Sequence, residues 1–114
     1  KEEAIAMYKK AIEINPNYAE PYNNLGVAYC MVGKKEEAIA MYKKAIEINP
    51  DHAEAYNNLG GVYYGMGRKE DAIAMYKKAI EINPNYTDAY NNLGTVYHGM
   101  GKKEDAIAMY KKAI

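Results

Sequence analysis

The sequence predicts an all-α fold, an α-solenoid in which similar helical hairpins stack side by side. Two recurring blocks and their fixed spacing carry this prediction. The block Ala-Ile-Ala-Met-Tyr-Lys-Lys-Ala-Ile-Glu-Ile-Asn-Pro occupies residues 4–16, 38–50 and 72–84, and its first nine residues return at 106–114. The block Tyr-Asn-Asn-Leu-Gly begins at Tyr22, Tyr56 and Tyr90. Both blocks recur every 34 residues, a period typical of stacked helical repeats.

The longer block predicts the second helix of each hairpin. These helices are expected over residues 35–48, 69–82 and 103–114, and a further copy is expected over residues 2–14. Apolar residues in the block recur three and four positions apart, the spacing of one helix face. The Asn-Pro pair at the end of the block stops the helix, because a residue before proline is disfavoured in the α region.

The shorter block lies in the first helix of each hairpin, expected over residues 19–32, 53–66 and 87–100. A glycine follows each of these helices, at Gly33, Gly67 and Gly101, and breaks the chain before the second helix.

A second set of glycines falls inside the first helices, at Gly26, Gly60 and Gly94. Glycine inside a helix costs about 1 kcal/mol relative to alanine, so its recurrence needs a packing reason. We expect a close backbone approach between helices, with small alanines such as Ala38 and Ala45 on the partner helix.

The spacing of these residues resembles the tetratricopeptide repeat family. The signature residues of the middle period are Tyr56, Leu59, Gly60, Tyr63, Ala72, Tyr76, Ala79 and Pro84. The family has Trp where this chain has Tyr56, and the other positions agree in the neighbouring periods too. The resemblance implies a right-handed superhelix of antiparallel helix pairs with the first helices on its concave face. It divides one continuous domain into a truncated repeat at 1–18, repeats at 19–52 and 53–86, and a truncated repeat at 87–114.

The resemblance also implies a function, since family members act as adaptors that bind an extended peptide in the concave groove. Asn24, Asn58 and Asn92 are similar to the asparagine ladder of O-linked N-acetylglucosamine transferases, which holds a peptide main chain. A carboxamide can both donate to and accept from a peptide backbone. The residues expected to contact a peptide are Asn23, Asn24, Asn57, Asn58, Asn91, Asn92, Glu20, Glu54, Asp88, Val27, Thr95, Tyr64 and His98. The remaining concave positions hold Cys30, Met31, Gly61, Gly65 and Gly99.

Three alternatives remain open from the sequence. The asparagines could bond to neighbouring side chains and bind no ligand. The chain could stack end to end through apolar residues at its ends (Met7 and Ile12, Met109 and Ile114), because repeat arrays without polar terminal helices expose such surfaces. It could also be the substrate-recruiting segment of a larger enzyme.

Charge and composition favour some function classes over others. The 15 basic and 15 acidic residues balance, so the sequence favours neither nucleic acid nor a membrane surface as partner. The acidic concave positions favour a neutral or mildly basic peptide. His52 and His98 have no ligand at metal-binding spacing, and no catalytic or cofactor motif is recognisable, so we expect no metal, no cofactor and no enzyme activity. The lone Cys30 makes a cytoplasmic location more favourable than a secreted one.

Overall fold

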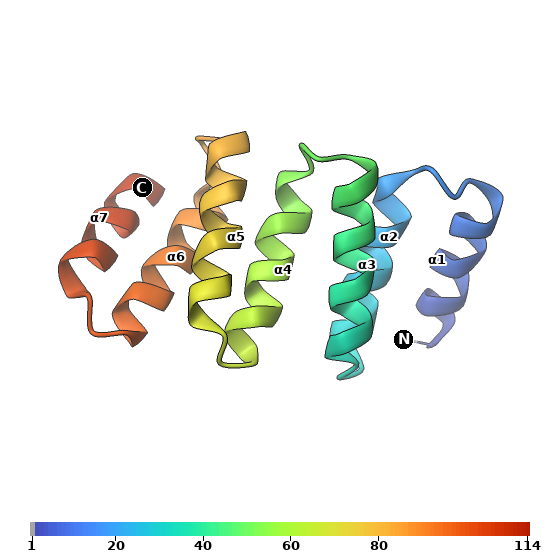
Figure 1. Ribbon diagram of the computed structural model, residues 1–114, viewed down its shortest axis with the longest axis horizontal. Helices are drawn as coiled ribbons and strands as arrows, with labels where there is room; N and C mark the ends of the chain where they lie inside the picture. Colours follow the sequence, from blue (N-terminus) through green and yellow to red (C-terminus); the bar gives the residue numbers. More distant parts are fainter. Residues whose placement is uncertain (1) are drawn as a thin grey trace.

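A computed structural model describes residues 2–114, which form seven α-helices joined by short turns (Figure 1). Lys1, the first residue of the predicted segment 1–18, lies outside the described residues. The helices are α1 (Glu2–Ile14), α2 (Ala19–Met31), α3 (Lys35–Ile48), α4 (Ala53–Gly65), α5 (Lys69–Ile82), α6 (Thr87–Gly99) and α7 (Lys103–Ala113). Each begins at the predicted residue, and four of them end one residue early. The all-α solenoid is therefore confirmed.

The seven helices form a row that measures 47 × 26 × 20 Å (Figure 1). Within residues 2–114, each helix packs against its neighbours in sequence, and α2 and α6 also contact α4. The second helices α3, α5 and α7 make no such contacts with one another in this part of the chain. Because the first helices contact one another and the second helices of the described chain do not, the row curves, and the first helices lie on its inner side.

The turn inside each hairpin depends on a glycine, as predicted. Gly33, Gly67 and Gly101 have φ values of 82°, 79° and 80°, in the left-handed region that glycine adopts without steric cost. At the first of these turns, Gly33 N–H donates to Cys30 O at 3.1 Å and Lys34 N–H donates to Tyr29 O at 2.9 Å. These bonds satisfy carbonyls at the end of α2 and fix where α3 begins.

The glycines inside the first helices have a packing reason, as expected, but the group that they approach is a side chain and not the backbone. A Cβ atom on Gly60 would lie 2.7 Å from Cε1 of Tyr76, whose ring is buried. Gly26 and Gly94 meet the rings of Tyr42 and Tyr110 in the same way. The small residue therefore makes room for an aromatic ring of the paired helix, and no backbone or alanine of that helix is the nearest neighbour.

The two ends of the row carry exposed apolar side chains, although not all of those predicted. Met7 on α1 is 66% exposed, and Ile114 is also exposed. Ile12 and Met109 are instead partly buried against the core. Ile14 and Ile107 are exposed in their place, because the face that each end helix turns outward differs from the face that the sequence suggested.

Candidate functional site

The concave ends of α2 and α4 enclose a depression of about 580 Å³, here called the central depression. It is lined by Val27, Cys30, Met31, Lys35, Tyr42, Asn57, Asn58, Gly61, Val62, Tyr64, Gly65, Tyr76 and Asn92. The expected site residues Val27, Asn57, Asn58, Tyr64 and Asn92 are therefore brought together here. Lys35, Tyr42 and Tyr76 were not anticipated, because they belong to second helices and reach the depression from beneath or from its rim.

The asparagines form hydrogen bonds from each repeat to the next. Asn58 Nδ2 donates to Asn23 Oδ1 at 3.1 Å, and Asn92 Nδ2 donates to Asn57 Oδ1 at 3.0 Å. Each bond fixes the orientation of the donating carboxamide. A carboxamide has two N–H donors and an oxygen with two lone pairs, so Asn58 and Asn92 each retain an N–H and the oxygen for another partner.

Asn23 differs from the other asparagines because it is fully enclosed. It is 1% exposed, whereas Asn57 at the same repeat position is partly buried and Asn91 is exposed. The placement of Asn23 on an open peptide-binding surface was therefore wrong. Its Nδ2 atom is buried without a hydrogen-bond partner among the described residues. Asn23 acts within the protein, as the acceptor that positions Asn58.

The tyrosine hydroxyls beneath the concave face meet a different neighbour in each repeat. Tyr42 Oη lies 3.7 Å from Cys30 Sγ, and Tyr110 Oη lies 3.3 Å from Thr95 Oγ1. Tyr76 Oη lies beneath Gly61, 3.7 Å from where a Cβ atom would be. Burial raises the pKa of Tyr76 to about 12 and also raises the pKa of Tyr42, so both hydroxyls are neutral donors at ordinary pH.

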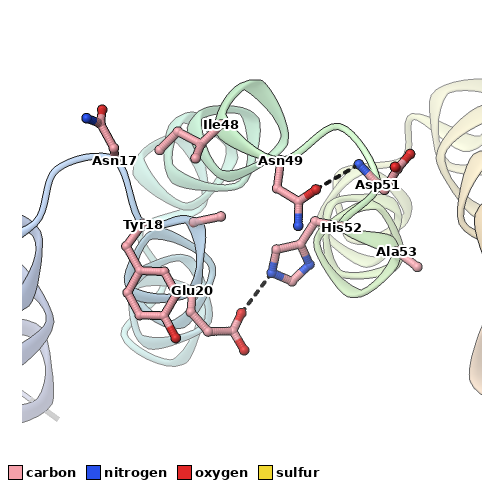
Figure 2. Close-up of a pocket in the computed structure, with 9 residues that line it drawn as sticks. Asn17, Tyr18, Glu20, Ile48, Asn49, Asp51, His52 and Ala53 are labelled. Carbon is pink, nitrogen blue, oxygen red and sulfur yellow. Dashed lines mark hydrogen bonds and ion pairs between the residues drawn. The ribbon is translucent and has the colours of Figure 1, made fainter.

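The acidic positions at the starts of the first helices lie outside the central depression. Glu20 instead borders a second depression of about 530 Å³ between α2 and the α3–α4 turn (Figure 2). His52 Nε2 lies 2.8 Å from Glu20 Oε1, and His52 Nδ1 accepts the backbone N–H of Ala55 at 3.3 Å. His52 thus caps α4 and joins two repeats.

Glu54 completes a group with Glu20 and His52 that the sequence did not reveal. One potential ligand atom of each residue lies within 4.8 Å of the other two. The hydrogen bonds argue against a metal ion at this group. Because Nδ1 accepts the N–H of Ala55, the ring proton belongs on Nε2, the atom that a metal would need. The sequence did not indicate the contact between Glu20 and His52, because the two residues are 32 positions apart in the chain.

Other expected site residues are dispersed. Thr95 Oγ1 donates to Asn91 O at 3.0 Å, so part of its hydrogen-bonding capacity is used inside α6. His98 and Asp88 are exposed on α6, and Asn24 is partly buried on α2. None of these residues lines the central depression within the described part of the chain. None of the helices in residues 2–114 is long and apolar enough to cross a membrane.

Comparisons with known proteins cover the whole described chain. A family model described as TPR repeat matches residues 2–33, 32–67 and 62–101, and one described as tetratricopeptide repeat matches residues 89–114. Among curated proteins, none is significantly similar to this chain.

Solved structures of MamA are similar to this chain. Two crystal structures of MamA align with a TM-score of 0.88 and 38% identity, over 96% and 98% of this chain. A structure of MamA MSR-1 C2 aligns with a TM-score of 0.78 and 28% identity, over 96% of this chain. The aligned regions cover 64%, 61% and 63% of those chains, so this chain spans less than two thirds of their length.

Proposed function

The chain belongs to the tetratricopeptide repeat family, and on that premise we propose that it binds an extended segment of another protein along its concave face. Its repeats make it a protein-interaction module, and scaffolds of this fold are generally non-catalytic. The ladder of Asn24, Asn58 and Asn92 would hold the main chain of the bound segment. This recognition does not depend on the sequence of the partner, because every residue of a peptide except proline offers the same N–H and C=O groups.

The observation that carries the proposal is the hydrogen bonding between repeats at Asn58 and Asn92. The bonds to Asn23 and Asn57 hold the two carboxamides in place before a ligand arrives. A side chain that is already ordered loses less conformational entropy on binding. Both carboxamides line the central depression with a donor and an acceptor still available.

The test uses backbone-modified peptides. Peptides that bind the chain are first selected from an array and then remade with N-methyl groups on alternate residues. We expect N-methylation to weaken binding to the unmodified protein by about tenfold, because a backbone donor is lost. The Asn92→Ala variant should bind the unmodified peptide more weakly and be less sensitive to N-methylation. Asn85→Ala, in an exposed turn, is the matched control. Equal sensitivity in all three proteins would contradict the proposal.

End-to-end association is a second candidate, favoured by the exposed apolar side chains of α1 and α7. One feature weighs against it. Both α1 and α7 carry the second-helix sequence, and within residues 2–114 no second helix packs against another. Sedimentation equilibrium at rising protein concentration distinguishes the two functions: a constant monomer mass removes this candidate, and a mass that grows without limit supports it.

A further inference from the structure

We infer that the central depression is a side-chain pocket for an apolar residue and for an acidic residue two positions later in the bound segment. This inference rests on the proposed function, since it concerns the same groove. The asparagine ladder alone would bind only the main chain of the segment. The pocket would add a preference for particular side chains.

The pocket exists because of two glycines. Gly61 and Gly65 occupy the repeat positions that hold Val27 and Met31 in the preceding repeat. A Cβ atom on Gly61 would have no neighbour nearer than Tyr76 Oη, at 3.7 Å, so the space above it is open. The position of Gly61 carries a side chain in the other two repeats, at Val27 and Thr95, whereas the position of Gly65 is also glycine in the third repeat, at Gly99. Of the three repeats, only the middle one lacks a side chain at both positions.

The sides of the recess are largely hydrocarbon. Val27 and Met31 on α2 are 38% and 61% exposed and lie together in the lining of the recess, where they form an exposed apolar patch. The ring of Tyr64 borders the recess on α4. Its volume of about 580 Å³ is within the usual range for sites that enclose a ligand group. An apolar side chain placed here would cover Val27 and Met31 and leave water.

The charge at the pocket favours an acidic residue close to the apolar one. Lys35 carries the only formal charge among the described residues that line the central depression. Its Nζ atom lies 3.8 Å from where a Cβ atom on Gly65 would be, so the ammonium group reaches across from α3 to α4. This sign differs from the preference for neutral or basic peptides that the sequence suggested. Glu20, Glu54 and Asp88 all lie outside the lining, and Glu20 is bonded to His52.

The asparagine ladder extends beyond the pocket, so an internal segment fits better than a chain terminus. Asn58 and Asn92 line the depression, whereas Asn24 on α2 lies outside its lining. We therefore assign the carboxylate to an Asp or Glu side chain. An extended chain turns alternate side chains to the same side. The apolar residue can then enter the recess while the residue two positions later faces the same side and reaches Lys35.

The experiment is an array of end-blocked decapeptides in a Gly-Ser background with two positions, separated by one residue, fully varied. The unmodified protein should select Leu, Ile or Met at the first varied position and Asp or Glu at the second. Gly61→Val fills the recess and should weaken binding of the selected peptides by about tenfold. Lys35→Glu should weaken it a few-fold and reverse the second preference toward Lys or Arg, since an exposed ion pair contributes little. Lys69→Glu makes the same change of charge at the equivalent position of the next repeat and should leave the selection unchanged.

The outcomes separate this inference from the function on which it rests. Binding that is lost with Asn92→Ala but keeps its selection with Gly61→Val would overturn the pocket and leave the groove intact. Peptides with a free terminal carboxylate that outcompete those with an internal Asp or Glu would overturn the assignment of the carboxylate. Failure of the unmodified protein to bind any peptide would overturn both proposals. Gly61→Val is expected to fold, because valine already occupies this position in the preceding repeat.

Discussion

The second helices and the concave ends of the first helices vary very differently within one chain. α3 and α5 differ at a single residue, Glu37 in place of Asp71, and their tyrosines pack on glycine in the same way. The concave ends instead carry Val, Cys and Met in one repeat and Gly, Tyr and Gly in the next. The packing of tyrosine on glycine inside each hairpin is therefore separate from the variation of these concave side chains. This separation lets the groove change its lining without a change of fold.

The largest predicted effect concerns the packing of the second helices. It is a loss of unfolding free energy at alkaline pH. Burial raises the pKa of Tyr76 to about 12 and also raises the pKa of Tyr42, while tyrosines in an unfolded chain ionise near about 10. Above the unfolded value the native state holds more protons than the unfolded state. The free energy of unfolding should therefore fall between about pH 10 and about pH 12.

Urea unfolding at several pH values, followed by circular dichroism, measures this fall. Tyr76→Phe should reduce the slope, because one of the perturbed hydroxyls is removed. A free energy of unfolding that stays constant over the same range would contradict the raised pKa values of these tyrosines.

A smaller effect is predicted for substitutions at two adjacent glycines. Gly60 packs against the paired helix, and Gly61 lines the central depression. Gly60→Ala places a Cβ atom 2.7 Å from the buried ring of Tyr76, and overpacking of this kind costs about 1–3 kcal/mol. Gly61→Ala meets only an ordinary contact and gains the higher helix propensity of alanine, about 1 kcal/mol. We expect the first variant to lose about 1–2 kcal/mol of unfolding free energy and the second to gain up to about 1 kcal/mol. If the urea midpoints of Gly60→Ala and Gly61→Ala shifted in the same direction, the two glycines would not differ in their role in packing.

The smallest effect compares two asparagines of the ladder. Asn58→Ala removes the partner of the enclosed Asn23, and a buried polar group left unsatisfied costs about 1–3 kcal/mol. Alanine's helix propensity offsets part of this cost, so we expect a net loss of about 1 kcal/mol. Asn92→Ala leaves Asn57 open to water and should change stability by less than about 0.5 kcal/mol. Equal losses in thermal or urea unfolding would contradict this difference. Asn92→Ala is therefore the better probe of binding.

The helix boundaries could be predicted because local residues fix them. Gly33 adopts a conformation that other residues avoid, and the Asn49–Pro50 pair disfavours continuation of α3. The fold followed from the period alone. In the same way, the residue type at Gly60 signalled a close contact, but only the packed hairpin revealed that the contact is the ring of Tyr76.

The candidate site was less predictable because it depends on contacts between repeats. Asn23 and Asn91 are the same residue at the same repeat position, yet one is enclosed and the other exposed. The bond between His52 and Glu20 joins residues 32 positions apart and has no local signature. Lys35 reaches the depression from a second helix, which the sequence placed on the opposite face. The sequence did contain one indication of the central depression. Gly61 and Gly65 leave space where the preceding repeat has side chains.

Contacts that join only neighbouring elements also govern how the row responds to force. Within residues 2–114 no helix contacts one beyond the adjacent hairpin, so no long-range contact ties the first hairpin to the last. A pull on the two ends is therefore opposed by one interface at a time. Each 34-residue unit that detaches would release about 110 Å of extended chain. Extension should proceed in equal steps, and a partner that spans two hairpins would act as a mechanical brace between them.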